Sequence, residues 1–285
     1  MSDRYAVIGH PIAHSLSPFI HAWFARACGQ DLTYEALDGG AAAGGFEAAV
    51  AAFVAAGGRG MNVTLPFKLR ALALADGASK AAQLAGAANA LRFGNGRIEA
   101  HNFDGAGLAR DIAVNLREPL RGRHVLLLGA GGATRGALLP LAQAGVASLT
   151  IANRTADKAE ALAAEFAPHV SPCLVRGMGL AALEAQADVD GGGFDIVINA
   201  TSASLQGHAP AVPGRVLAAA RLAYDMVYGA RPTAFMQAAQ AAGCPRQSDG
   251  LGMLLEQAAE SFAWWRGARP DTQGARAAVL ARLRG

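Results

Sequence analysis

The sequence has few aromatic side chains and few cysteines, and each shortage narrows the class of protein. Aromatic residues make up 6% of the 285 residues, whereas Ala and Gly are abundant, which is typical of Ala-lined helices rather than of disorder. The three cysteines, Cys28, Cys173 and Cys244, are far apart and lack CxxC spacing. This scattered, odd set indicates a reducing compartment and disfavours a disulfide framework or a zinc site.

Excess charge and long apolar runs are also missing. The formal net charge is +3, and the basic residues are dispersed apart from a modest cluster within 117–123, so we expect no nucleic-acid partner. The Ala-rich run 41–58 is interrupted by Glu47 and carries little transfer free energy, which predicts a helix of a soluble protein rather than a membrane span. Asp3 and Arg4 lead directly into a predicted strand, so we expect no signal peptide and a cytoplasmic protein.

The stretch 124–155 is the most informative part of the chain. The apolar run 125–128 predicts a strand that is buried on both faces, and a Gly-rich turn, an apolar-periodic helix and a second strand at 148–152 follow. This is one βαβ unit, and such a crossover implies a parallel sheet.

The Gly-rich turn resembles a phosphate-binding loop. Gly129 and Gly131 would let the backbone approach a pyrophosphate, and the small residues after them would keep the helix amides close to the anion. The match to G-x-G-x-x-G is imperfect because Thr134 occupies the third position, and a plain strand-to-helix turn also favours Gly. The residues expected to bind the pyrophosphate are Gly129, Ala130, Gly131, Gly132 and Ala133.

The end of the second strand indicates which dinucleotide binds. An NAD site usually has Asp or Glu here, where it accepts the ribose 2′-hydroxyl. This chain has Asn153, Arg154 and Thr155, with Lys158 one turn later. No carboxylate is present to repel a phosphate, and Arg154 can form a bidentate pair with one. The alternative is that Arg154 is solvated and Thr155 only caps the next helix, but the set favours NADP.

The N-terminal part predicts a second α/β layer. Strands at 5–8, 32–37 and 61–65 alternate with helices at 18–28, at 46–56 and from Pro66 onward. A chain of 285 residues also favours two domains. Farther along, the pattern predicts a hairpin through 94–96 with its return strand at 97–100. It then predicts strands at 172–176, 194–199 and 221–226, helices at 106–115, 233–242, 251–265 and 271–283, and a polar surface loop at 185–193.

Ser15 and Ser17 place two hydroxyls beside the start of the first helix. The amides and partial positive charge of a helix N-terminus suit a carboxylate. The spacing alone favours the alternative that Ser17 is only the N-cap before Pro18 and Ser15 only a loop residue. Three nearby histidines, His10, His14 and His21, lack helical ligand spacing and an acidic partner, so we expect no metal site.

Lys68 and Asp104 are candidates for proton transfer. Lys68 falls in the first turn of the predicted helix from Pro66, where the helix dipole disfavours a cation. Its side chain either reaches water or has a function there, and a positioned lysine can take part in proton transfer. Asp104 precedes the helix predicted at 106–115, where it is either an ordinary N-cap or a carboxylate that holds Lys68.

Eight motifs in this order resemble those of the shikimate dehydrogenase family. They are HSLSP at 14–18, NVTLPFK at 62–68, GAANAL at 86–91, NFDG at 102–105, GAGGATR at 129–135, NRT at 153–155, NATS at 199–202 and GLGMLLEQA at 250–258. Each motif is weak alone, but the set spans nearly the whole chain. The resemblance implies a two-domain α/β fold with an N-terminal catalytic domain, an NADP-binding Rossmann-like doubly wound domain, and a cleft between them. It implies a discontinuous substrate domain of 1–104 and 251–285, and a cofactor domain of 105–250.

The resemblance also implies roles for individual residues. Lys68 and Asp104 would form the catalytic pair in the reversible NADPH-dependent reduction of 3-dehydroshikimate to shikimate. The substrate would be held by Ser15, Ser17, Thr64, Asn89, Tyr228 and Gln257, with the two serines on its carboxylate. Asn153, Arg154, Thr155 and Lys158 would hold the adenosine phosphate, and Thr201, Met226 and Gly250 would lie near the cofactor. For Thr201 the alternative is ordinary turn chemistry, and for Gln257 it is an ordinary buried amide bonded to backbone.

Two positions depart from the family pattern. Ala90 stands where the family often has Thr, and Phe103 stands where it usually has Thr. Phe103 either reshapes the wall of the pocket or packs in the hinge, and it leaves room for a relative that also oxidises quinate. A quinate/shikimate dehydrogenase that uses NAD is one alternative. A non-catalytic dinucleotide sensor is a second alternative. We expect a small-molecule substrate, no membrane or nucleic-acid partner, no metal, and a monomer or homodimer.

Overall fold

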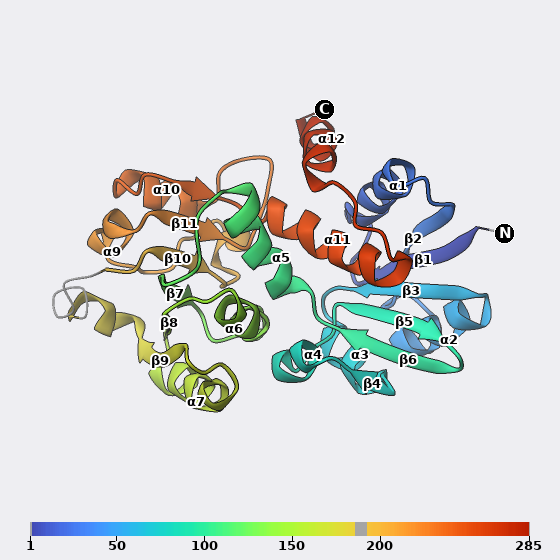
Figure 1. The fold of residues 1–285 in the computed structure, drawn as a ribbon, viewed down its shortest axis with the longest axis horizontal. Helices are drawn as coiled ribbons and strands as arrows, with labels where there is room; N and C mark the ends of the chain where they lie inside the picture. Colours follow the sequence, from blue (N-terminus) through green and yellow to red (C-terminus); the bar gives the residue numbers. More distant parts are fainter. Residues whose placement is uncertain (1, 186–192, 285) are drawn as a thin grey trace. The chain divides into compact units, whose positions relative to one another are not determined.

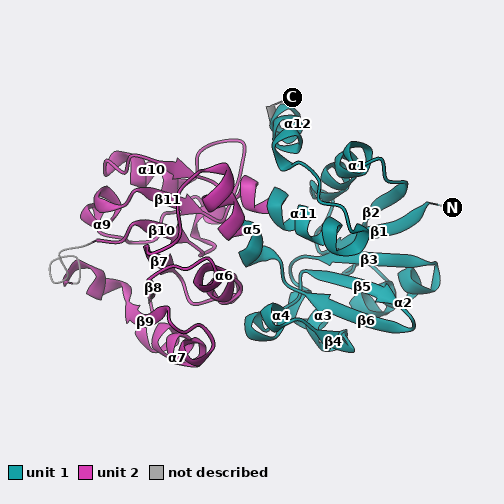
Figure 2. Ribbon diagram, in the orientation of Figure 1, with its two compact units in different colours: residues 1–107, 255–285 teal, residues 108–254 magenta. Residues whose placement is uncertain are grey.

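The computed structural model describes residues 2–185 and 193–284 as two compact units (Figures 1 and 2). Unit 1 comprises residues 1–107 and 255–285, and unit 2 comprises residues 108–254. The surface loop predicted at 185–193 lies almost entirely outside the described residues. Within the described ranges, no helix is long and apolar enough to cross a membrane.

Unit 1 contains a mixed six-stranded sheet in the order β2-β1-β3-β5-β6-β4. Neighbours β1, β2 and β3 pair in parallel, β5 pairs antiparallel with β3 and with β6, and β4 pairs in parallel with β6. The predicted hairpin is therefore present. The strands are β1 (Asp3–Gly9), β2 (Leu32–Asp38), β3 (Gly58–Val63), β4 (Gly77–Ala78), β5 (Ala90–Gly94) and β6 (Arg97–His101).

The helices of unit 1 come from both ends of the chain (Figure 1). Trp265 of the C-terminal part donates from Nε1 to the carbonyl of Leu91 at 3.0 Å, which fixes a late helix on an early strand. Apolar side chains such as Phe46, Met61 and Phe67 form a dry core on the sheet. The helices are α1 (Ser17–Ala27), α2 (Gly45–Ala55), α3 (Lys68–Leu74), α4 (Lys80–Ala85), α5 (Asp104–Arg110), α11 (Leu251–Arg266) and α12 (Thr272–Arg284), of which α5 and α11 continue across the boundary between the units.

Unit 2 contains a six-stranded sheet in the order β12-β11-β10-β7-β8-β9, and every pairing in it is parallel. The chain runs from β7 outward to β9 and then returns to the other side of β7 with β10, which makes β7 and β10 a topological switch point. The strands are β7 (His124–Leu128), β8 (Ser148–Asn153), β9 (Leu174–Gly179), β10 (Ile196–Asn199), β11 (Leu222–Asp225) and β12 (Gln247–Ser248). The helices are α6 (Gly132–Gln143), α7 (Ala156–Phe166), α9 (Gly214–Ala219) and α10 (Ala234–Ala241).

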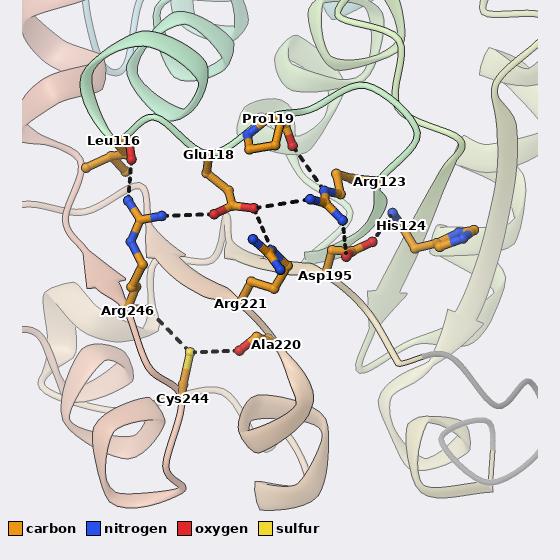
Figure 3. Close-up of polar contacts among 10 residues, drawn as sticks. All are labelled: Leu116, Glu118, Pro119, Arg123, His124, Asp195, Ala220, Arg221, Cys244 and Arg246. Atoms are coloured by element: carbon orange, nitrogen blue, oxygen red, sulfur yellow. Dashed lines mark hydrogen bonds and ion pairs between the residues drawn. The ribbon is translucent and has the colours of Figure 1, made fainter.

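A buried carboxylate holds the amino ends of four strands of unit 2 together (Figure 3). Glu118 is 2% exposed and accepts hydrogen bonds from Arg221 Nε at 2.8 Å and from Arg246 Nη1 at 2.9 Å. Arg123 Nη2 lies 3.9 Å from the same carboxylate, and its Nη1 bonds to Asp195 at 3.0 Å. The four strands β7, β10, β11 and β12 are directly preceded by Arg123, Asp195, Arg221 and Arg246. One ionic cluster therefore fixes the sheet edge opposite the one that bears the Gly-rich turn.

Two predicted helix starts and one strand end are wrong, and local hydrogen bonds explain them. Ser17 is the first residue of α1 and Leu16 is its N-cap, so Ser17 is not the cap. The strand predicted to Leu65 ends at Val63 because the chain then turns, with Phe67 N–H donating to the carbonyl of Thr64 at 3.0 Å. The next helix therefore begins at Lys68 rather than at Pro66, which lies in this turn.

Other boundaries are shifted by a few residues. The helix predicted at 106–115 begins at Asp104, whose N–H donates to the Asn102 side chain at 3.1 Å just before the first turn. It continues through Asn115 as a π-helical turn, Asp111–Asn115. The strand predicted at 172–176 lies at Leu174–Gly179, where it pairs with β8.

Candidate functional site

Most of the predicted substrate residues gather at one edge of the unit 1 sheet. β1 and β3 are parallel, so their carboxyl ends reach the same edge, and the antiparallel pairing of β5 with β3 brings the start of β5 to it. β6 ends there too, because Ala90 pairs with His101. The residues that follow or precede these strand ends are Ser15, Ser17, Thr64, Lys68, Asn89 and Asp104.

Lys68 and Asp104 form the contact that was predicted for them. Lys68 Nζ lies 2.7 Å from Asp104 Oδ2, and the side chains are 27% and 20% exposed. Lys68 opens α3 and Asp104 opens α5, so two helix starts carry the pair. The ammonium group is held by a carboxylate while its remaining protons stay available to a ligand.

Asn89 connects this ion pair to helix α11. Its Nδ2 donates to Asp104 Oδ1 at 2.8 Å and to Gln257 Oε1 at 3.1 Å, and its Oδ1 accepts from Phe103 N–H at 2.8 Å. Gln257, expected to be buried, is half-buried on α11. Three segments far apart in the sequence therefore meet at one amide.

The two serines lie at the start of α1. Both are half-buried, and Ser15 Oγ accepts the Ser17 N–H at 3.3 Å. Thr64 is half-buried and packs so tightly on Gly9 that a Cβ at Gly9 would lie 2.4 Å from its methyl group. Two hydroxyls thus lie beside the N-terminus of α1, a helix of eleven residues.

The Phe103 side chain is buried against other aromatic rings. It is 7% exposed, and its ring stacks on His101 with centroids 3.9 Å apart and planes 4° apart. Trp264 lies edge-on at 5.7 Å. Phe103 is thus part of a packed aromatic cluster, and Ala90 is fully buried in β5. Burial beside these rings also lowers the pKa of His101.

The three nearby histidines lie in different surroundings. His10 Nδ1 lies 2.8 Å from Asp38 Oδ1, His14 is exposed, and His21 is buried against Tyr34. Across residues 2–185 and 193–284, no cluster of three or more His, Cys, Asp or Glu side chains is arranged to hold a metal ion.

In unit 2, the Gly-rich turn leaves its backbone open. Gly129 has φ +99°, which favours glycine, and a Cβ there would lie 3.0 Å from Thr201 Cγ2. A Cβ at Gly131 or Gly132 would meet no atom within 4 Å, so a ligand can reach the backbone amides at the start of α6. Thr134 explains the imperfect motif: it is buried, and its hydroxyl donates to the Gly129 carbonyl at 2.7 Å, which closes the turn.

The residues after β8 present two cations. Asn153 ends β8 and donates from Nδ2 to the Thr155 carbonyl at 2.9 Å. Thr155 is the N-cap of α7, but its side chain makes no capping hydrogen bond. Arg154 and Lys158 are exposed, and within the part of the chain that the structure describes neither has an ion-pair partner. Both charges are therefore available to a phosphate.

A buried aspartate organises the loops after β10 and β11. Asp225 is fully buried and accepts hydrogen bonds from Asn199 Nδ2 at 3.1 Å, Ser204 Oγ at 2.6 Å and Thr233 Oγ1 at 2.7 Å. Asn199 Oδ1 in turn accepts from the Thr201 hydroxyl at 2.7 Å. Thr201 thus takes part in turn chemistry, and this network fixes its position beside Gly129.

Gly250 lies against the loop that holds Met226. A Cβ at Gly250 would lie 2.1 Å from the Met226 carbonyl oxygen, and Gly250 N–H donates to the Val227 carbonyl at 3.1 Å. Tyr228 is half-buried on the same loop, where burial and the charge of Asp249 raise the pKa of its hydroxyl. Tyr228 belongs to unit 2, so it is not among the substrate residues gathered at the edge of unit 1.

Sequence reasoning missed three polar residues that support these groups: Asn62, Asn102 and Asp225. Each is buried, and each hydrogen-bonds to a candidate site residue or to a loop that carries one. The signal was present, because Asn62 and Asp225 are polar residues within or at the end of otherwise apolar strands. A polar side chain in such a place needs a partner.

The fold and site together define a two-domain α/β protein with one unit of the dinucleotide-binding type. Three protein-family models match the chain. The family model of the shikimate dehydrogenase substrate binding domain matches residues 7–91, the shikimate/quinate 5-dehydrogenase model matches residues 111–206, and the model of the shikimate 5′-dehydrogenase C-terminal domain matches residues 250–280. The NADP(+) shikimate dehydrogenase of Aromatoleum aromaticum is 57% identical over 99% of this chain and 97% of its own length.

Solved structures agree along the whole chain. An Ael1 enzyme from Pseudomonas putida is 56% identical with a TM-score of 0.89, covering 99% of this chain and 98% of its own. Shikimate 5-dehydrogenase from Thermus thermophilus, solved in complex with NADP(H) and shikimate, is 34% identical with a TM-score of 0.81 and covers 99% of each chain. This chain belongs to the shikimate dehydrogenase family of oxidoreductases.

Proposed function

We propose that this protein interconverts 3-dehydroshikimate and shikimate with NADP as its cofactor. The observation that carries the proposal is the hydrogen-bonded group of Lys68, Asp104, Asn89 and Gln257 at one edge of unit 1. It combines a proton donor, a carboxylate that orients it, and two amides suited to hydroxyl groups. Membership of the shikimate dehydrogenases supports the choice of substrate.

The residues of unit 2 fit NADP. The open amides after Gly131 and the start of α6 suit a pyrophosphate, and the cations of Arg154 and Lys158 suit a 2′-phosphate better than a bare ribose hydroxyl. Met226 and Gly250 are proposed to lie near the nicotinamide. When bound, NADPH supplies the hydride that reduces the substrate ketone.

Lys68 is proposed to move the proton. In the reducing direction its ammonium group donates to the carbonyl oxygen as negative charge builds there, and in the oxidising direction its amine takes the hydroxyl proton. Asp104 holds Nζ in place and compensates its charge. Because Asn89 bonds to the same carboxylate, the position of Lys68 is linked to a residue proposed to bind the substrate hydroxyls.

The remaining residues of unit 1 are proposed to orient the ring. Ser15 and Ser17 offer hydroxyls to the substrate carboxylate beside the positive end of α1. Thr64 and Gln257 hydrogen-bond to the substrate hydroxyls, and Tyr228 of unit 2 lines the substrate site. Fixing both ends of the ring lowers the entropic part of the barrier.

The test is an initial-rate assay of the purified chain at mildly alkaline pH with shikimate or quinate, each with NADP and with NAD. We expect turnover with shikimate and NADP well above the other three pairings. Rates that favour quinate or NAD would move the protein to a dual-substrate or NAD-dependent branch. Binding of NADPH without turnover of any pair, by folded protein, would identify a dinucleotide sensor instead.

A further inference from the structure

A buried carboxylate without a cationic partner lies beside the switch point of unit 2. Asp225 ends β11 and is fully buried, and among residues 2–185 and 193–284 it accepts only from uncharged donors. Its Oδ1 accepts from Asn199 Nδ2 at 3.1 Å and from the Val227 N–H at 3.0 Å. Its Oδ2 accepts from the Ser204 hydroxyl at 2.6 Å and from the Thr233 hydroxyl at 2.7 Å. Burial of a carboxylate costs free energy, but a fully hydrogen-bonded network makes the segments that it joins rigid.

The first of these segments is the β10 loop, residues 200–206. Asn199 Oδ1 accepts from the Thr201 N–H at 3.1 Å and from the Thr201 hydroxyl at 2.7 Å. Asn199 Nδ2 donates to Ser204 Oγ at 3.2 Å as well as to Asp225. Thr201 packs on the Gly-rich turn, since a Cβ at Gly129 would lie 3.0 Å from Thr201 Cγ2. The carboxylate therefore fixes the loop that contacts the turn proposed to bind the pyrophosphate.

The second segment is the β11 loop, residues 226–233. Its start and its end both bond to Asp225, through the Val227 N–H and through the hydroxyl of Thr233, the N-cap of α10. The loop is also held from another side, because the Gly250 N–H donates to the Val227 carbonyl at 3.1 Å. A Cβ at Gly250 would lie 2.1 Å from the Met226 carbonyl oxygen, so this contact is close.

We propose that Asp225 is a positioning residue that sets the separation between the pyrophosphate end and the nicotinamide end of the NADP site. This inference rests on the proposed function, which assigns Met226 and Gly250 to the nicotinamide. The β10 loop contacts the pyrophosphate turn, the β11 loop carries Met226, and both loops bond to one carboxylate. Loops that are already ordered lose less conformational freedom when a ligand binds. The phosphate site of Arg154 and Lys158 lies outside this network.

The test measures the binding of NADPH and of ADP-ribose 2′-phosphate to the purified chain without substrate, by isothermal titration calorimetry. This fragment keeps the adenosine phosphate and the pyrophosphate but lacks the nicotinamide. Asp225→Asn keeps the shape of the side chain and removes its charge, which weakens the hydrogen bonds from both loops. We expect the Kd for NADPH to rise about tenfold, as for a lost hydrogen bond to a charged group. The Kd for the fragment should change by less than about twofold.

The matched control is Asp195→Asn, the same change at another carboxylate of unit 2. Asp195 accepts from Arg123 at 3.0 Å and from the His124 N–H at 2.9 Å, at the opposite sheet edge. Both Kd values of this control should match those of the wild type. A second variant, Ser204→Ala, keeps Asp225 and removes one hydroxyl from the network. It should raise the Kd for NADPH about threefold without changing that of the fragment, and it decides the question if Asp225→Asn does not fold.

Equal losses for NADPH and the fragment would overturn the proposal, because they would assign the network to the general stability of unit 2. Unchanged binding of NADPH by both variants would overturn it as well. The proposed function fails in a different way. A wild type that binds NADPH without turning over shikimate would refute that function and leave the selective loss measurable, whereas a wild type that does not bind NADPH would refute both.

Discussion

Replacing His21 by Phe should remove part of the acid sensitivity of unit 1. Burial lowers the pKa of His21 from 6.5 to about 3, although the side chain of Asn62 offsets part of that effect. Neither ring nitrogen has a hydrogen-bond partner among the described residues, so the ring remains neutral in the folded chain. Phe preserves the stacking on Tyr34 and cannot titrate.

The free energy of unfolding decreases as the pH falls because the unfolded chain binds a proton at His21 more readily than the folded chain does. Below pH 6.5 the unfolded chain takes up a proton at His21 that the folded chain does not bind. The stability associated with the neutral ring is therefore present above this pH, and it is lost progressively as the pH falls toward the folded pKa of about 3. Between about pH 7.5 and about pH 5.5 the loss amounts to about 1.4 kcal/mol. This window ends well above the folded pKa, so the figure depends on the unfolded pKa alone.

Tryptophan fluorescence is a suitable probe for this measurement. The three tryptophans, Trp23, Trp264 and Trp265, all lie in unit 1, so urea unfolding followed by their emission reports on the unit that contains His21. Acidification should lower the free energy of unfolding of the wild type by about 1.4 kcal/mol more than that of His21→Phe. His101, which is half-buried, contributes equally to both proteins.

The control is His208→Gln, which removes an exposed histidine. It should retain the acid sensitivity of the wild type. Parallel pH dependences for the wild type and His21→Phe would refute the reasoning, because they would mean that His21 is protonated equally in the folded and unfolded chains.

Three further predictions concern Lys68, Arg154 and the ionic cluster of unit 2. Lys68→Ala should lower kcat by about 10²- to 10⁴-fold with a modest change in KM, and a loss confined to KM would reassign the lysine to binding. Arg154→Ala should weaken NADP about tenfold and NAD much less, so equal weakening in a titration would rule out the phosphate assignment. Glu118→Gln should destabilise unit 2 by about 3 kcal/mol, the lower end for a buried ion pair, because Arg221 and Arg246 are 53% and 41% exposed. Faster hydrogen exchange in β7 and β10 would register the effect, and unchanged exchange would contradict it.

The order of elements could be predicted because most of it is local. The βαβ unit at 124–155, the hairpin through 94–96 and the last two helices each follow from apolar periodicity and turn residues within a short window. The contact between Lys68 and Asp104 was predictable as an opposite-charge pair, although the distance between Nζ and Oδ2 was not. The roles of these two residues remain predictions.

What could not be predicted depends on partners far away in the chain. In the sequence Thr134 interrupts the glycine motif, whereas in the structure its hydroxyl closes the turn by donating to the Gly129 carbonyl. Pro66 looked like a helix start, but hydrogen bonds of the preceding turn delay the helix to Lys68. Tyr34 and Asn62 are 28 residues apart, and no spacing rule relates them. Tertiary contacts of this kind override local preference.

The division of unit 1 between the two ends of the chain has a consequence for biosynthesis. The segment 108–254 is continuous and emerges from the ribosome before residues 255–285, so unit 2 can fold while unit 1 still lacks its last part. Gln257 and Ser261, which bond to Asn89 and Asn62, are made only after all of unit 2. A nascent chain can therefore fold unit 2 early, but it completes the hydrogen bonds around Asn62 and Asn89 only after residues 257–261 have emerged.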